Sequence, residues 1–146
     1  MIGRLSTIAP DLVTLLEQQQ SEQLRKVAAR AANLAIERTH LRELRIDYAL
    51  AALREGRLGS TPERSAIQYL TDELDEIAWD AQERMEAGIG SRQDYSTAFR
   101  RARAAASVGF ALDSNALTAA LESVYEAHAA VADLDAVRAI VGIGDA

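Results

Sequence analysis

The sequence has no cysteine, only two prolines and few aromatic residues. The lack of cysteine excludes several kinds of site, and the scarcity of aromatic residues limits the kind of core that the chain can form. A chain without cysteine forms no disulfide, no thiolate metal site and no cysteine nucleophile, and it suits a reducing, cytoplasmic compartment. Aromatic residues make up 5% of the chain, although hydrophobic residues make up 49%. Much of the apolar content is therefore alanine, which contributes little burial per residue and favours closely packed helices.

The sequence also lacks a long apolar run. Residues 1–16 contain one basic residue and a proline inside a short apolar stretch, which matches neither a secretory signal nor a membrane span. We therefore expect a cytoplasmic protein that does not associate with membranes. A chain of 146 residues has the length of one ordinary domain, which buries roughly two-thirds of the surface of the unfolded chain.

Alternation of apolar and polar residues, which is typical of half-buried strands, is missing, whereas apolar residues recur with helical spacing along most of the chain. Pro10 suits a first helical turn, Gly56 and Gly88 suit helix ends, and Ser91 suits a helix start. We therefore predict an all-α, single-domain bundle of five to six helices, arranged as antiparallel helical hairpins without a β-sheet. The predicted helices span residues 10–38, 40–55, 61–87, 92–109, 114–131 and 134–141.

Several details of this prediction depend on individual residues. An interruption is expected near Gln20–Ser21, and Thr39 is expected to cap the helix over 40–55. Ser60 is expected to cap the next helix, with Glu63 completing a capping box. For the helix over 114–131 the expected cap is Asp113 or Ser114. The helix over 40–55 has apolar residues on two faces, which predicts a central position in the bundle.

Negative charge is concentrated in one predicted helix. Between Glu63 and Glu86 eight acidic residues accompany two arginines, so this stretch has a net charge of −6, equal to that of the whole chain. Trp79, the only tryptophan, lies off the apolar stripe and among carboxylates. Its ring is either covered by another helix or presented to a partner, and tryptophan is enriched at binding hot spots. The predicted partner-binding residues are Trp79, Asp72, Asp75, Glu76, Glu83 and Glu86.

Neither histidine has a complete set of potential metal ligands around it. Glu37 and His40 have the E-x-x-H spacing of carboxylate-bridged di-iron bundles, but such a site requires a second copy, and His128 has no glutamate three residues before it. His128 lies on a predicted apolar stripe, where a polar contact in the core is expected. No nucleophile motif accompanies it. We therefore assign no catalytic residue, no metal ligand and no cofactor.

Two further charged groups allow alternative interpretations. Glu73 and Glu76 resemble the E-x-x-E half of the magnesium site in all-α nucleotide pyrophosphohydrolases, but no E-x-x-D follows to supply the other ligands. A solvated helix face is the simpler interpretation of these acidic residues. Arg100, Arg101 and Arg103 are too few for a nucleic-acid surface on an acidic protein, so we expect them to pair with the acidic helix.

These observations together predict a non-enzymatic protein–protein interaction module that binds a basic protein. The concrete form that we favour is an immunity or inhibitor-type protein that neutralises a basic bacterial toxin or nuclease. One alternative is a helical bundle that binds an apolar small molecule in an internal pocket lined by alanine and leucine. Another is a magnesium-dependent pyrophosphohydrolase, which predicts convergent carboxylates from two helices. Nucleic acid is not an expected partner, and the sequence leaves homo-oligomerisation open.

Overall fold

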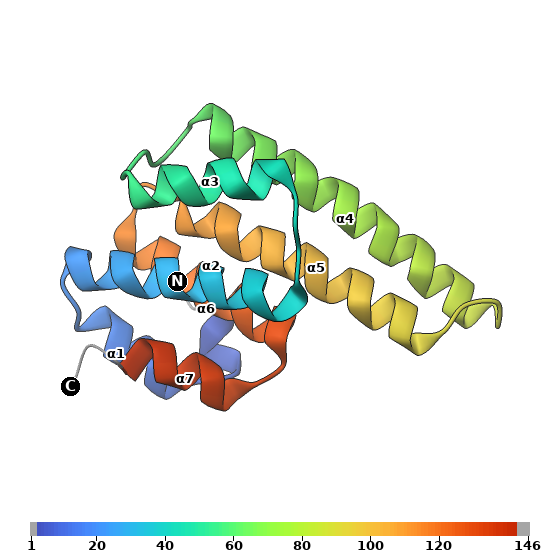
Figure 1. Cartoon of the computed structure of the whole chain (residues 1–146). Coiled ribbons are helices and arrows are strands. Elements are labelled where there is room, and N and C mark those ends of the chain that lie inside the picture. Colours follow the sequence, from blue (N-terminus) through green and yellow to red (C-terminus); the bar gives the residue numbers. More distant parts are fainter. Residues whose placement is uncertain (1–2, 143–146) are drawn as a thin grey trace.

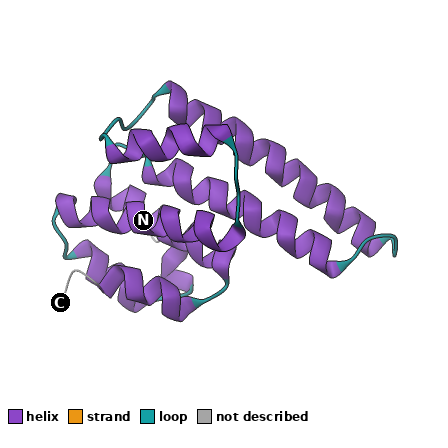
Figure 2. Ribbon diagram, viewed as in Figure 1, coloured by secondary structure: helices purple, strands orange, loops and turns teal. Residues whose placement is uncertain are grey.

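The structure, a computed structural model, describes residues 3–142, and over this range it consists of helices and loops without a strand (Figure 2). This confirms the all-α prediction. The predicted helix over 10–38 divides in two, which gives seven α-helices in place of the predicted five to six. A short 3₁₀ helix, η1 (Arg4–Thr7), is followed by α1 (Pro10–Glu17), α2 (Ser21–Thr39), α3 (Leu44–Arg54), α4 (Pro62–Glu86), α5 (Arg92–Ala111), α6 (Ala116–Val131) and α7 (Leu134–Gly142).

Helices α2, α5 and α6 pack against one another and form the centre of the bundle (Figure 1). Their buried surfaces consist largely of alanine, which lets the helix backbones approach closely. One flank of this centre is covered by η1, α1 and α7, and the other by α3 and α4. The buried core draws residues from every α-helix of the described chain. No described helix combines the length and the apolar composition that a bilayer crossing requires.

The central helix α5 is buried on all sides near its carboxyl-terminal end. Six consecutive residues, 104–109, are buried there, which a helix achieves only with neighbours all around it. A Cβ atom added to Gly109 would lie 3.2 Å from Cγ2 of Ile67 on α4. Glycine therefore permits the close approach of α4 and α5 at this point.

The hairpin formed by α4 and α5 extends beyond the other helices (Figure 1). Gly88 has a left-handed backbone (φ 78°) and ends α4, as predicted from the sequence. Between residues 77 and 100, Ala78 is the only fully buried residue. We call residues 77–100 the projecting half of the hairpin, and residues 62–74 with 102–111 its inner half.

The expected break near Gln20–Ser21 is confirmed, because residues 18–20 separate α1 from α2. The prediction that Thr39 caps the next helix is wrong. Thr39 is the last residue of α2, and its hydroxyl donates a hydrogen bond back to the carbonyl oxygen of Ala35 at 2.8 Å. His40 then adopts a left-handed conformation (φ 54°), and α3 begins only at Leu44.

Two predicted caps are each displaced towards the carboxyl terminus. Thr61, not Ser60, caps α4, because Pro62 occupies the first helical position and the residue before it must be the cap. Asn115, rather than Asp113 or Ser114, caps α6. Asp113 instead accepts a hydrogen bond from the backbone N–H of Asn115 at 2.8 Å. The predicted cap at Ser91 is confirmed by its hydrogen bond from the N–H of Asp94 at 3.0 Å.

The predicted central position of the helix over 40–55 is also wrong. Helix α3 packs mainly on α4, and the side chains of Leu44 and Tyr48 on its outer face are exposed. It buries Ile46, Ala49 and Ala52 instead. The central position belongs to α5, because its small residues allow several helices to pack closely around it. The bulky residues on the outer face of α3 remain exposed.

Candidate functional site

The predicted partner-binding residues lie largely on an exposed face of α4. Trp79 is 61% exposed, so no neighbouring helix of the described chain covers this residue. Most of the predicted carboxylates are exposed as well, whereas Asp75 is partly buried and pairs with Arg103 on α5. The exposed carboxylates are Asp72, Glu76, Glu83 and Glu86.

Negative charge on this face is poorly neutralised by the rest of the protein. Arg45 on α3 holds the carboxylate of Glu73 at 2.9 Å, and this hydrogen bond lowers the pKa of Glu73. Towards the carboxyl-terminal end of α4, the acidic residues have no arginine partner of this kind in the described chain. Five acidic residues of α4 form no ion pair within residues 3–142: Asp72, Glu76, Asp80, Glu83 and Glu86.

A groove of about 340 Å³ opens beside Trp79, between α4, α5 and α6. Aromatic side chains form much of its wall, and charged side chains cross its floor. We call it the Trp79 groove, and its lining residues are Arg4, Asp75, Ala78, Trp79, Gln82, Tyr95, Phe99, Arg103, Tyr125, Glu126 and Ala129. It connects the acidic face of α4 with the centre of the bundle.

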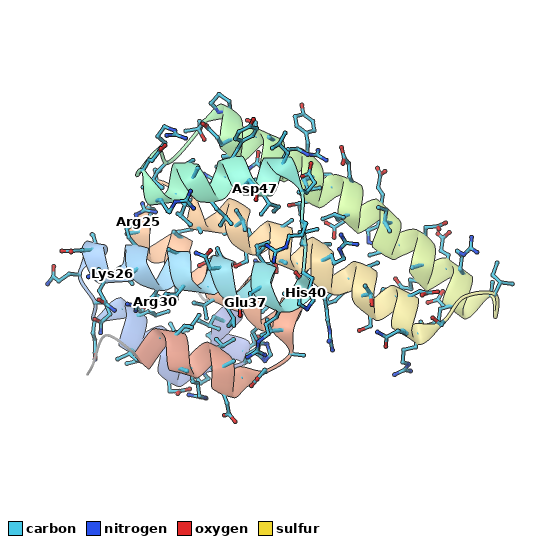
Figure 3. The ribbon with its side chains drawn as sticks, in the orientation of Figure 1. Arg25, Lys26, Arg30, Glu37, His40 and Asp47 are labelled. Carbon is cyan, nitrogen blue, oxygen red and sulfur yellow. The ribbon has the colours of Figure 1, made fainter. Side chains whose placement is uncertain are left out.

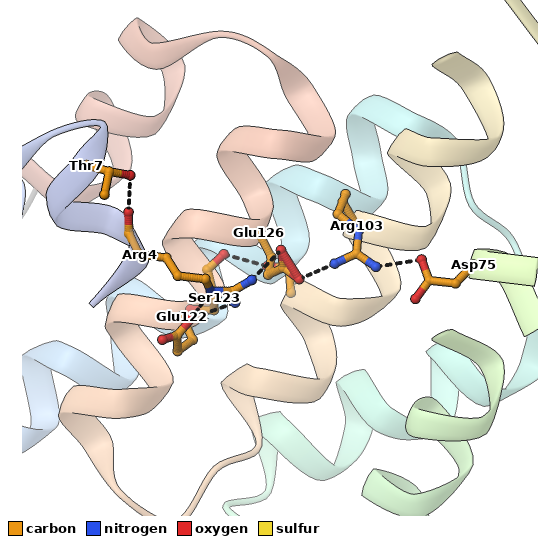
Figure 4. A network of polar contacts seen from close by, with 8 residues as sticks. Arg4, Thr7, Asp75, Arg103, Glu122, Ser123 and Glu126 are labelled. Atoms are coloured by element: carbon orange, nitrogen blue, oxygen red, sulfur yellow. Dashed lines mark hydrogen bonds and ion pairs between the residues drawn. The ribbon is translucent and has the colours of Figure 1, made fainter. Parts of the chain in front are cut away.

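A chain of alternating charges runs through the floor of the groove (Figure 4). Arg103 donates one hydrogen bond to Asp75 and another to Glu126, each at 2.7 Å. Arg4 contacts Glu122 at 2.6 Å and lies 3.7 Å from Glu126. The order Glu122, Arg4, Glu126, Arg103, Asp75 therefore links η1, α6, α5 and α4 by ionic contacts.

Glu126 is the most deeply buried charge of this chain, with 1% of its side chain exposed. Burial raises the pKa of Glu126, because a carboxylate loses hydration there, and Arg103 and Arg4 partly offset this effect. The Oε2 atom of Glu126 accepts the hydrogen bond from Arg103. The Oε1 atom has no hydrogen-bond partner among the described residues. The guanidinium of Arg4 is a cation close to this buried atom, and its Nη1 lies 3.7 Å away.

Guanidinium groups already lie against aromatic faces in and around the groove. The guanidinium of Arg4 is 4.3 Å from the ring centroid of Tyr125 and 5.5 Å from that of Phe110. Arg103 lies 5.9 Å from the centroid of Phe99. Aromatic faces attract cations through their quadrupole, so this environment suits a positively charged side chain.

Sequence reasoning did not identify Arg4 or Glu126 as site residues. Glu126 belongs to a buried face of α6 that otherwise contains small residues at helical spacing, namely Ala119, Ser123 and Ala130. This pattern was the available signal, but small residues mark a helix face less clearly than bulky ones do. The signal for Arg4 was weaker, because its partners lie more than a hundred residues away.

The expected pairing of three α5 arginines with the acidic helix holds for one of them. Arg103 contacts Asp75, whereas Arg100 and Arg101 form no ion pair within residues 3–142. The helical period places Arg101, two positions before Arg103, on the opposite side of α5. Arg100 lies one turn before Arg103 on a similar side, but it has no acidic partner within ion-pair distance in residues 3–142.

The histidines stand apart from the groove. His128 is half-buried and makes no side-chain hydrogen bond within residues 3–142, so the predicted polar contact in the core is not found there. Glu37 and His40 are both exposed at the end of α2. In the described part of the chain, no group of three or more histidine, aspartate or glutamate side chains is placed to hold a metal ion.

Chemically, the groove combines aromatic surface with two arginines and two carboxylates that contact one another, and the exposed carboxylates of α4 lie outside its lining. The exposed carboxylates of α4 attract cations over distance, and aromatic faces stabilise cations on contact. Comparisons of the chain with protein-family models, with curated proteins and with solved structures find no match.

Proposed function

We propose that the protein is a non-enzymatic interaction module that binds a basic protein through α4 and the Trp79 groove. The observation that carries this proposal is the 61% exposure of Trp79 at the edge of the groove, among carboxylates without ion pairs. A large exposed ring beside a concave surface is the arrangement of a binding anchor. The surrounding negative charge favours a positively charged partner and speeds its approach.

The groove indicates how such a partner would be held. A lysine or arginine side chain entering beside Trp79 would meet the rings of Tyr95 and Phe99 and the partly exposed carboxylate of Asp75, which also pairs with Arg103. The partner's basic surface around this inserted side chain would lie over the exposed acidic residues of the projecting half. Affinity would then come mainly from the inserted side chain and Trp79, and rapid association from the acids.

The favoured form of this function is an inhibitor or immunity-type protein of the cytoplasm that neutralises a basic bacterial toxin or nuclease. Small size and acidic character support it. The apolar-ligand alternative gains no support, since each of the five prominent hollows of the described residues includes a charged side chain in its lining. The phosphohydrolase alternative gains none from the carboxylates of α4, most of which face outward.

The test begins with capture of the partner by the full-length chain, followed by titration calorimetry with the purified partner. Replacing Trp79 by alanine should weaken binding by roughly 2 kcal/mol or more, or about 30-fold, with an unchanged circular dichroism spectrum. Tyr69→Ala is the matched control, because Tyr69 is another largely exposed aromatic residue on α4, and it lies outside the groove lining. It should bind the partner as the wild type does.

A second variant separates the contribution of charge. Reversing Glu76 and Glu83 to lysine should mainly slow association in stopped-flow measurements and leave dissociation nearly unchanged. An acidic partner, or equal loss of binding in the Trp79→Ala and Tyr69→Ala variants, would contradict the proposal.

A further inference from the structure

A basic pocket lies on the opposite side of α5 from the Trp79 groove. It has a volume of about 400 Å³ and is formed where α2 and α6 end beside the middle of α5. Figure 3 shows His40 at the carboxyl-terminal end of α2. The polar side chains in its lining are Arg38, Thr39, His40, Thr97, Arg100 and Arg101, and its lining contains no carboxylate. Its apolar part comes from an alanine and a valine of α6.

The positive charge of this pocket is largely uncompensated. Arg38 contacts Asp133 at 3.5 Å, but Arg100 and Arg101 have no ion pair and no side-chain hydrogen bond within residues 3–142. The Nε atom of Arg101 is buried and has no hydrogen-bond partner in that range. A buried donor without a partner destabilises the folded state, so a ligand towards which the Arg101 side chain turns this N–H group would be bound more tightly.

Arginines can also neutralise helix ends, and the carbonyl ends of α2 and α6 beside this pocket carry partial negative charge. Arg25 shows how an arginine of this protein performs that role, since it donates hydrogen bonds to the carbonyl oxygens of Asp113 and Ser114 after α5. Arg100 and Arg101 make no such bond. Two helix ends together contribute about one negative charge, which two full positive charges exceed. The pocket therefore keeps a net attraction for anions.

We infer that this pocket binds a small phosphorylated molecule, with its phosphate between Arg100 and Arg101. Guanidinium groups donate paired hydrogen bonds that match the spacing of phosphate oxygens. Thr97 can add a hydroxyl donor, whereas Thr39 already donates its hydroxyl to Ala35. The volume exceeds what phosphate alone needs and falls within the range of small-ligand sites. Its lining contains no tryptophan, tyrosine or phenylalanine, and this scarcity of large aromatic surface favours a polar ligand such as a sugar phosphate over a nucleobase.

This inference is independent of the proposed function, because the two sites share no lining residue. It is tested with the full-length chain labelled with ¹⁵N and titrated with ribose 5-phosphate, inorganic phosphate or citrate at constant ionic strength. Saturable shifts should appear for amides of residues 38–40 and 97–101. Tighter binding of ribose 5-phosphate than of inorganic phosphate would support an organic ligand, and equal binding would support recognition of the phosphate group itself.

Variants then assign the binding to the pocket. Arg101→Gln and Arg100→Gln should each lower the affinity for ribose 5-phosphate by about tenfold or more. The exposed Arg100 keeps the test informative if the Arg101 variant folds poorly. Arg92→Gln is the matched control, because Arg92 is an exposed arginine of α5 outside the pocket, and it should bind normally. Binding of citrate alone, no saturable binding at millimolar concentrations, or equal losses in all three variants would overturn the inference.

Discussion

The inner half of the α4–α5 hairpin packs Ile67, Leu70 and Val108 into the core, whereas the projecting half leaves Ile77, Trp79 and Ile89 exposed. The same two helices therefore differ strongly in burial along their length. In the inner half, small residues bring the backbones together and stability depends on close packing. In the projecting half, little is buried, so side chains are free to serve recognition. The Trp79 groove lies where the two halves meet.

The largest expected effect comes from the buried ion chain at this junction. Glu126→Ala would leave Arg103 and Arg4 facing a vacated buried site, and breaking a buried pair in this way typically costs about 3–5 kcal/mol. Urea denaturation followed by circular dichroism measures this loss in the free energy of unfolding. Glu86→Ala in the projecting half is the control and should change the free energy of unfolding by less than about 0.5 kcal/mol. Similar losses in both variants would remove the energetic distinction between the halves.

A somewhat smaller effect is expected where α4 and α5 approach most closely. Gly109→Val should lower the free energy of unfolding by about 1–3 kcal/mol, because its side chain would press against Ile67 in a packed core. Gln93→Val places the same side chain at an exposed position of α5 in the projecting half. Thermal denaturation of both variants should show a clearly lower melting temperature only for Gly109→Val.

A moderate effect concerns pH. Because burial raises the pKa of Glu126 above its ordinary value of 4.5, the folded protein binds this proton more tightly than the unfolded chain does. The stability of the wild type relative to Glu126→Gln should therefore increase as the pH falls from the folded pKa towards 4.5. Arg103→Gln should raise the pKa of Glu126 further, since Arg103 lowers it. NMR of the side-chain carboxyl carbon measures the pKa of Glu126 in the wild type and in Arg103→Gln. A pKa below 4.5 in the folded wild type would contradict the prediction.

The comparison with Glu126→Gln is needed because other carboxylates act in the opposite direction. Hydrogen bonds from Arg138 and Arg45 lower the pKa values of Asp11 and Glu73, respectively. Their stabilisation is present at neutral pH and is lost as the pH falls through their folded pKa values. Both contributions occur equally in the wild type and the variant, so they cancel in the difference.

Apart from the control variants, the smallest expected effect on stability is that of Trp79→Ala. The ring is largely exposed, so its removal should cost less than about 1 kcal/mol, whereas a buried tryptophan would cost about 3–5 kcal/mol. Trp79 is the only tryptophan, so iodide should quench the fluorescence of the isolated protein efficiently. A blue-shifted, protected emission would place the ring in the core and remove the anchor from the proposed function.

Sequence reasoning predicted most helices because breakers such as Gly56 and Gly88 and the cap Ser91 act locally, through the backbone of their own turn. It predicted an outward-facing Trp79 as one of two options from the helical period alone. It misjudged α3 and α5, because apolar periodicity detects bulky residues and overlooks a helix buried through alanine. Neither the ion chain nor the basic pocket could be predicted, since each joins helices whose arrangement depends on packing throughout the bundle.

The position of Arg4 has a practical consequence for handling this protein. A single turn of 3₁₀ helix at the edge of the fold supplies one of the two cations that contact Glu126. Fusion partners or affinity tags joined near this turn would act on the floor of the groove through that contact. Affinity tags are therefore best placed away from this turn, and trimmed variants that start after residue 4 would test directly how much Arg4 contributes to the floor of the groove.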